Sequence, residues 1–202
     1  MQIEKLCPGS WGANCYLLSS NGHAAVVDPS LSVIKLMEVI RERGLTVDLI
    51  LLTHGHFDHI TSIDTLRDAT GAPVLIHSAD AELLGDSYKN AFSHFFDTDR
   101  VYRPAERTLE DGDVLTLGEE TIKVVHTPGH TRGSVCFLLE DGHLLTGDTV
   151  FAMGYGRYDL YGGSLTTLLE SIGKLRHLPQ DLIILPGHGE QATLGASLDV
   201  YF

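Results

Sequence analysis

The feature that most constrains the fold of this 202-residue chain is an internal repeat. Residues 14–28 and residues 134–148 each contain an apolar run, an Asn-Gly or Asp-Gly pair, and a second apolar run that ends at an aspartate. Asn-Gly and Asp-Gly favour the positive φ angles of a type I′ turn, so both segments are predicted to be β-hairpins. Each hairpin is followed by apolar residues at helical spacing and then by a short apolar strand. The order hairpin, helix, strand therefore occurs twice.

The remaining pattern indicates two sheets. The first predicted helix is marked by Leu31, Ile34 and Ile40, and the buried strands begin at Asp48 and Asp181. The second helix is marked by Leu165, Leu168, Leu169, Ile172 and Leu175. Outside the repeat we predict a strand over 1–6, a helix over 60–70, a strand over 73–76, an irregular stretch over 84–107, and strands over 114–117 and 121–125. Two sheets packed face to face, with helices on both outer faces, bury this pattern in an α+β fold. A single domain over residues 1–202 is expected, with halves of approximately 1–110 and 111–202.

Composition excludes several classes of protein. The chain has 14 basic and 27 acidic side chains, a net charge of −13, and no Lys/Arg-rich run, which argues against nucleic-acid binding. No apolar run approaches the ~20 residues of a membrane-spanning helix, and no signal segment precedes the first predicted strand. The three cysteines, Cys7, Cys15 and Cys136, form no C-x-x-C pair and are expected to pack in the core. The expected compartment is the cytoplasm.

A cluster of metal-binding residue types follows the first buried strand. Residues 53–59 read T-H-G-H-F-D-H, so His54, His56, Asp58 and His59 lie on one loop at a strand end. Imidazole and carboxylate groups are suitable ligands for zinc, iron or manganese. Three histidines crowded on one loop gain little unless something coordinates them. The loop therefore predicts a metal site.

Three more candidate ligands follow other apolar strands. His130 lies in H-T-P-G-H-T, Asp148 ends the second hairpin in L-L-T-G-D, and His188 lies in L-P-G-H-G. Each is weak support alone, but together with the first loop they make seven ligands. Seven ligands are enough for two metal ions that share Asp148. The other histidines are expected to be structural or exposed.

These motifs, in this order, resemble the metallo-β-lactamase superfamily over nearly the whole chain. The resemblance implies a four-layer αββα sandwich with internal duplication and a metal site along one edge of the two sheets. It implies that His54, His56 and His130 hold one metal, that Asp58, His59 and His188 hold the other, and that Asp148 bridges them. Asp28, the repeat partner of Asp148, would contact the ligand side chains without binding a metal itself. The implied cofactors are two divalent ions, with zinc the first choice and iron or manganese as alternatives.

Within the superfamily, the chain resembles the glyoxalase II (hydroxyacylglutathione hydrolase) branch in its short single-domain form. The resemblance rests on V-D-P-S, H-T-P-G-H-T-R-G-S and G-R-Y-D-L-Y-G-G-S. True β-lactamases of this kind commonly have Cys where this chain has Asp148, which argues against that activity. The branch implies hydrolysis of a small-molecule thioester by a hydroxide held between the two metals, with Asp58 orienting the hydroxide. A thiolate leaves readily, so no general acid is required.

In two-domain members of the branch, a helical C-terminal extension supplies basic residues that grip glutathione, and we expect no such extension here. Replacement substrate contacts are expected from two segments, which contribute Lys89, Phe92, Phe95 and Phe96 in a lid and Tyr155, Arg157 and Tyr158 in a loop. Three alternatives stay open. One is a persulfide dioxygenase, in which two histidines and the residue matching Asp148 hold a single iron. Another is hydrolysis of another ester or lactone, and the third is a binding module that has kept the fold without catalysis.

Overall fold

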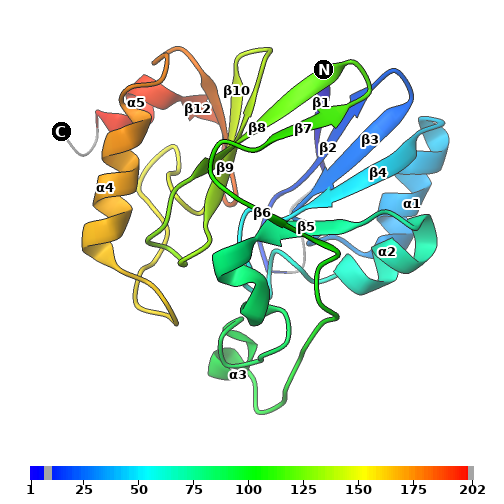
Figure 1. Cartoon of the computed structure of the whole chain (residues 1–202), viewed down its shortest axis with the longest axis horizontal. Coiled ribbons are helices and arrows are strands. Elements are labelled where there is room, and N and C mark those ends of the chain that lie inside the picture. Colours follow the sequence, from blue (N-terminus) through cyan, green and yellow to red (C-terminus); the bar gives the residue numbers. More distant parts are fainter. Residues whose placement is uncertain (7–10, 200–202) are drawn as a thin grey trace.

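Two six-stranded mixed β-sheets form the centre of the molecule (Figure 1). The structure is a computed structural model that describes residues 1–6 and 11–199, so Cys7 lies outside the described residues. The first sheet has the order β1 (Gln2–Leu6), β2 (Cys15–Ser20), β3 (His23–Val27), β4 (Thr46–Leu51), β5 (Val74–His77), β6 (Arg107–Leu109). The second sheet has the order β12 (Ala192–Thr193), β11 (Ile183–Pro186), β10 (His143–Gly147), β9 (Val135–Leu139), β8 (Glu120–His126), β7 (Val114–Leu117).

Helices cover both outer faces of the sheet pair. Helices α1 (Val33–Glu42) and α2 (Ile63–Thr70) lie against the first sheet, and α4 (Leu165–Leu175) and α5 (Leu194–Leu198) lie against the second (Figure 1). Three apolar layers fill the spaces between these four layers: helix to sheet, sheet to sheet, and sheet to helix. The predicted αββα sandwich is thereby confirmed. None of the helices in the described part of the chain is both long and apolar enough to cross a membrane.

Strands inside the sandwich are apolar on both faces because both faces are covered. In β2, Cys15 and Leu17 belong to the layer under the helices, whereas Tyr16 and Leu18 belong to the layer between the sheets. This alternation follows from the two-residue period of a strand. Cys15 and Cys136 are both buried, as their predicted packing role requires, and burial raises the pKa of the Cys136 thiol to about 11.

The predicted repeat is present in three dimensions. In the first copy, hairpin β2–β3 leads through α1 to β4, which pairs in parallel with β3. In the second copy, hairpin β9–β10 leads through α4 to β11, which pairs in parallel with β10. Both copies therefore deliver the ends of two parallel strands to the same edge of their sheets.

Several details differ from the sequence-based expectations. The first hairpin turns through two residues with positive φ, Asn21 and Gly22, but the second has a three-residue loop in which only Gly142 has positive φ. That loop matches a type I turn followed by a left-handed glycine, so the predicted type I′ turn is wrong there. Helix α2 begins at Ile63 rather than Ile60, after a stretch of turns. The stretch 84–107 contains a short helix, α3 (Phe92–Phe95), and a 3₁₀ helix, η1 (Ser78–Leu83), precedes it; the three-residue strand β6 was not predicted.

Candidate metal centre

One group of three ligand atoms comes from the loop after β4 and the loop after β8. His54, His56 and His130 each offer one nitrogen atom that could bind a metal, and these three atoms lie within 4.8 Å of one another. The Nδ1 atom of His56 is 2.8 Å from the Nε2 atom of His130. All three side chains are buried, with exposed fractions of 3% or less. Three imidazoles therefore converge on one point at the edge of the sheets.

A second group lies beside the first. Asp58, His59 and His188 also bring their ligand atoms within 4.8 Å of one another. The Nε2 atoms of His59 and His188 are 3.2 Å apart, and the Nε2 atom of His188 is 3.3 Å from Oδ2 of Asp58. Asp58 and His188 are partly exposed, whereas His59 is fully buried. This group is therefore a mixed nitrogen and oxygen set that opens toward solvent.

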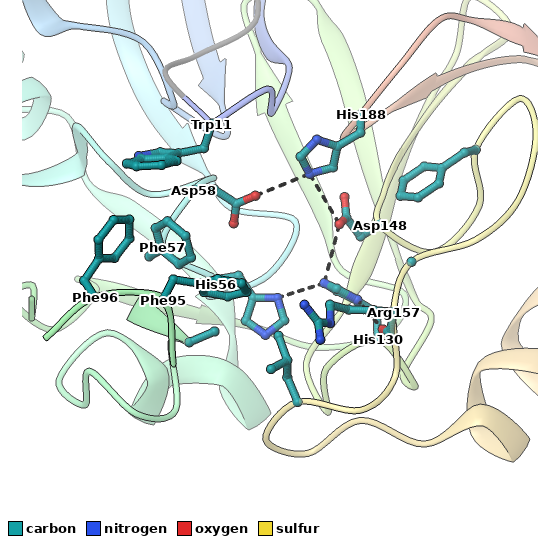
Figure 2. Close-up of a pocket in the computed structure, with 14 residues that line it drawn as sticks. Trp11, His56, Phe57, Asp58, Phe95, Phe96, His130, Asp148, Arg157 and His188 are labelled. Carbon is teal, nitrogen blue, oxygen red and sulfur yellow. Dashed lines mark hydrogen bonds and ion pairs between the residues drawn. The ribbon is translucent and has the colours of Figure 1, made fainter. Parts of the chain in front are cut away.

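Asp148 lies between the two groups, as Figure 2 shows. Its Oδ2 atom is 3.6 Å from Nε2 of His130 in the first group and 3.6 Å from Nε2 of His188 in the second. Its Oδ1 atom is 3.4 Å from Nε2 of His59. One carboxylate thus faces ligands of both groups.

Hydrogen bonds behind the ligands fix which ring nitrogen faces the cluster. The Nδ1 atom of His130 donates to the carbonyl oxygen of Arg157 at 2.7 Å, and Nδ1 of His59 donates to Oδ2 of Asp28 at 2.9 Å. The hydroxyl of Thr53 donates to Oδ2 of Asp28 at 2.6 Å and is therefore free to accept from Nδ1 of His54, 3.1 Å away. In each of these three histidines, Nδ1 is engaged behind the cluster and Nε2 is the nitrogen that faces it, which is the arrangement that metal-binding histidines use.

Asp28 is the common acceptor of this network. It is buried, with a φ of +49°, and it also accepts from the backbone N–H of Thr53 at 2.8 Å. The possible ligand atoms of Asp28, His54 and His59 also lie within 4.8 Å of one another. The oxygens of Asp28 are already engaged by three donors, however, so its geometry favours support of the ligands over direct binding.

The cluster has the polar groups that a cation would satisfy. Among the described residues, Nε2 of His54, Nε2 of His56 and Oδ1 of Asp148 are buried without a hydrogen-bond partner. Buried polar atoms are normally paired, so unpaired atoms that converge indicate a missing partner. Nitrogen and oxygen donors of this kind suit zinc, iron or manganese. The residues therefore fit a pair of divalent ions.

Protonation differs between the two groups. Burial and the neighbouring histidines hold the pKa of His54 and of His56 well below the usual value, so both rings are neutral at pH 7. Burial also opposes the charged form of His59, but the carboxylates of Asp58, Asp148 and Asp28 outweigh it and raise the pKa of His59 to about 10. In the metal-free protein, a proton therefore occupies the second group, where the carboxylates favour a cation.

A buried carboxylate that sequence analysis missed joins the two ligand-bearing loops. Asp80 lies in η1 and is fully buried. Its carboxylate accepts from the N–H of Gly55 at 3.0 Å, from the hydroxyl of Thr131 at 2.7 Å and from the N–H of Gly133 at 2.7 Å. Gly55 lies between His54 and His56 in the chain, and Thr131 follows His130. Asp80 thus holds the first ligand group together from outside it.

Two glycines allow the loops to approach Asp148. A Cβ atom on Gly187 would lie 2.2 Å from Oδ1 of Asp148 and 2.7 Å from Cε1 of His59. A Cβ atom on Gly156 would lie 2.1 Å from the carbonyl oxygen of Asp148 and 2.8 Å from Nδ1 of His130. Any side chain at either position would displace a residue of the cluster.

A cavity of about 350 Å³ opens over the cluster. Its walls include four residues of the two ligand groups and Asp148, as well as a set of large apolar side chains. Apart from these residues of the cluster, the described lining residues are Trp11, Phe57, Ala91, Phe95, Phe96, Phe151, Gly156, Arg157 and Leu160. A cavity of this size suits a small-molecule substrate.

The predicted substrate contacts are only partly at this cavity. Phe95, Phe96 and Arg157 line it. Lys89, Phe92, Tyr155 and Tyr158 are not among its described lining residues. Lys89 forms an ion pair with Glu82 and lies 5.1 Å from the centre of the Tyr161 ring, and Phe92 packs behind Phe96 with ring centres 4.5 Å apart.

Trp11, Phe151 and Leu160 were missed by sequence analysis. Trp11 stands alone in a Gly-rich segment, and Phe151 and Leu160 belong to the insertion after Asp148, where no periodic pattern marks their direction. The one available signal was the placement of Phe151 three residues after a predicted ligand.

Comparison with known proteins gives matches over nearly the whole chain. A sequence profile of the metallo-beta-lactamase superfamily matches residues 8–188, a range that includes all seven residues of the cluster. Hydroxyacylglutathione hydrolase GloC of Haemophilus influenzae is 31% identical over 199 residues, which are 96% of this chain and 94% of that protein. The crystal structure of the BLEG-1 B3 metallo-beta-lactamase matches with a TM-score of 0.92 and 35% identity, covering 98% of this chain and 97% of that one. The di-iron-bound form of TTHA1623 matches with a TM-score of 0.84 and 32% identity, covering 96% of each chain.

Proposed function

Because the chain belongs to the metallo-beta-lactamase superfamily, we propose that it is a metal-dependent hydrolase that cleaves thioesters at a two-metal site. The observation that carries the proposal is the position of Asp148 between two complete groups of ligands. One group alone would make a mononuclear site. Two groups that share a carboxylate favour a dinuclear site.

We propose that His54, His56 and His130 bind one divalent ion, that Asp58, His59 and His188 bind the other, and that Asp148 contacts both. The first group offers three imidazole nitrogens, and the second offers two imidazole nitrogens and a carboxylate oxygen. Zinc accepts both donor sets. The similarity to the di-iron form of TTHA1623 supports iron as the alternative.

When bound, the two ions would lower the pKa of a water molecule to near neutrality and polarise the substrate carbonyl. The chain's own residues orient these reactants. Burial opposes ionisation of Asp58, but His59, His188 and His56 outweigh it and hold the pKa of that carboxyl below its usual value. Asp58 therefore stays ionised at neutral pH and can accept a hydrogen bond from the attacking water. Asp28 and Thr53 keep His54 and His59 in the required tautomers.

The choice of a thioester rests on the similarity to GloC and on the chemistry of the leaving group. An ordinary thiol has a pKa of about 8.5, so a thiolate leaves without prior protonation. This matches the cavity, because its described lining residues include no side chain outside the cluster that is placed as a proton donor. An amine or alkoxide leaving group would need such a donor.

The experiment is purification without added metal, elemental analysis, and an assay with S-lactoylglutathione and with a second lactoyl thioester. The expected result is two zinc or iron ions per chain and hydrolysis of at least one thioester. A single iron per chain, with oxygen uptake on glutathione persulfide, would instead indicate the persulfide dioxygenase. Two metals without thioester hydrolysis would contradict the proposal.

A double variant gives the control for the metal site. His54→Ala with His188→Ala removes one ligand from each group and leaves both sheets untouched. We expect turnover to fall by about 10³-fold or more while circular dichroism stays unchanged. Retained turnover in the double variant would rule out this mechanism.

A β-lactam is the second candidate substrate class, because the match to BLEG-1 spans almost the whole of both chains. The same preparation can be assayed with a chromogenic cephalosporin. We expect cephalosporin turnover to be slower than thioester turnover, since amine departure needs a proton that the described lining residues do not supply. A cephalosporin rate above every thioester rate would favour the second candidate.

A further inference from the structure

One side of the cavity is a continuous surface of aromatic rings. Trp11, Phe57, Phe95 and Phe96, called here the aromatic wall, lie together on one side of the cluster (Figure 2). The Trp11 ring centre is 5.0 Å from that of Phe96 and 5.9 Å from that of Phe57, and Phe57 is 5.7 Å from Phe95. The four rings therefore form one contact surface.

The aromatic wall is only partly covered by the rest of the chain. Trp11 is 48% exposed and Phe95 is 53% exposed, although each packs on Phe57, which is buried. Large aromatic side chains that remain exposed beside a cavity leave apolar area in contact with water, which is unfavourable. Clustered exposure of this kind marks a binding surface for an apolar group.

Outside the proposed metal site, the walls of the cavity offer little to an anionic substrate. Arg157 is the only Lys or Arg among its described lining residues, and residues 7–10, beside Trp11 in the chain, contain neither. The Arg157 guanidinium is already paired with Asp159, through Nε to Oδ1 at 2.8 Å and through a second nitrogen to Oδ2 at 2.9 Å. Its Cζ atom lies 5.8 Å from the ring centre of Phe95. The pair Arg157–Asp159 is neutral and borders the aromatic wall.

Glutathione does not match these walls. It carries two carboxylates and an ammonium group, and a carboxylate placed on aromatic rings without a partner loses hydration that nothing replaces. A lactoyl group is small, so most of the cavity must accept the other part of the thioester. That part meets the aromatic wall.

We propose that the aromatic wall binds the thiol part of the substrate and that this part is uncharged and apolar, such as an aryl or alkyl thiol. The inference rests on the proposed thioesterase function and adds its substrate class. The chain then prefers a lactoyl thioester of benzyl mercaptan to the same lactoyl thioester of glutathione.

Binding can be measured without catalysis because Trp11 is the only tryptophan of the chain. Metal-free protein is titrated with benzyl methyl sulfide and, separately, with S-methylglutathione, while tryptophan emission is recorded. The sulfide is expected to change the emission saturably, and S-methylglutathione at the same concentration is expected to leave it unchanged. No saturable change with the sulfide, or an equal change with both, would overturn the inference.

Two exposed aromatic residues of the segment 84–107 supply matched variants. Phe95→Ala removes a ring of the aromatic wall, whereas Tyr88→Ala removes a ring that is 59% exposed and outside the cavity lining. Because both side chains are exposed, neither truncation is expected to unfold the chain. Phe95→Ala should weaken sulfide binding by about ten-fold, and Tyr88→Ala should leave it unchanged. Equal effects of the two variants would contradict a role of the aromatic wall.

Catalysis then separates this inference from the proposed function. The metal-loaded enzyme should hydrolyse S-lactoyl benzyl mercaptan with kcat/KM at least about ten-fold above that of S-lactoylglutathione. Asp159→Asn, which frees Arg157, should lower KM for S-lactoylglutathione by about two- to five-fold, the worth of an exposed ion pair. Hydrolysis of neither thioester would defeat the proposed function while the fluorescence titration still decides the inference. A preference for S-lactoylglutathione would defeat the inference alone.

Discussion

The two copies of the repeat place an aspartate at the same point and use it differently. Asp28 follows β3 and Asp148 follows β10, each directly beyond the second strand of its hairpin. Asp28 accepts from the N–H and hydroxyl of Thr53 and from the ring of His59. Asp148 is less enclosed by donors, and its Oδ1 has no hydrogen-bond partner among the described residues.

The loops after the second parallel strand account for this difference. After β4 the chain continues with a threonine and four candidate ligands, so Asp28 meets donors from that loop. After β11 it continues with Gly187 and His188, and Gly187 leaves room for Asp148 to reach the cluster. The same backbone position therefore becomes a support in one copy and a candidate ligand in the other, according to what the neighbouring loop presents.

The largest effect is expected from Asp148→Asn. An amide is a poor substitute for a carboxylate between two cations, so we expect kcat for the best substrate to fall by about 10³-fold or more and metal content to fall below two per chain. The thermal unfolding midpoint of the metal-free protein should also fall, because the protonated ring of His59 loses one of the three carboxylates that stabilise its charge. Two metals and full activity in this variant would break the contrast between the two aspartates.

A smaller effect is expected from Asp28→Asn. The amide nitrogen of asparagine cannot accept from Thr53 or from His59, so both supported histidines lose an anchor. Metal affinity, measured by competition with a chelator, should fall by about 10- to 100-fold, as is typical when a partner behind a ligand is removed. Asp48→Asn is the matched control, because Asp48 accepts from the exposed His23, which lies at the opposite end of β3 from Asp28. Equal losses in the two variants would show that Asp28 has no special role.

The smallest effect is a difference in proton release between the two ligand groups. His54 and His56 are neutral at pH 7, whereas the pKa of His59 is raised to about 10 and that of His188 is also raised. A metal entering the second group must displace a proton, so its affinity should rise with pH by about ten-fold per unit through the neutral range. Metal binding at the first group should release fewer protons, because His54 and His56 are already neutral there. Calorimetric titration in buffers of different ionisation enthalpy counts the protons, and equal counts for both metals would remove the distinction.

Much of this architecture could be predicted because apolar residues recur at regular intervals along its strands and helices. The hairpins, α4 and the parallel strands carry regular apolar spacing, which is dictated by burial on fixed faces. The four motifs that carry the candidate ligands could be found because several histidines and aspartates seldom occur so close together after apolar strands. Both kinds of signal are local in the sequence.

The remaining features depend on contacts between distant segments. Asp80 gives no local signal, since its importance lies in donors from residues 55, 131 and 133. Lys89 was predicted to contact substrate, but Glu82, seven residues earlier, faces it instead. Strand β6 has a single buried residue, Leu109, so no alternation marks it. Trp11 lines the cavity because Ala13 and Asn14, which follow it, pair with His188 and Gly187 far away in the sequence.

The close approach of Gly187 and Gly156 to Asp148 has a consequence for how this protein can change. Neither position tolerates even a methyl group, so the reactive machinery allows few substitutions. Trp11 and Phe95, by contrast, keep about half of their surface in solvent and can be replaced at little cost to folding. A mutant library confined to those rim positions should therefore yield many folded variants with new substrate ranges, whereas one confined to the glycines should yield almost none.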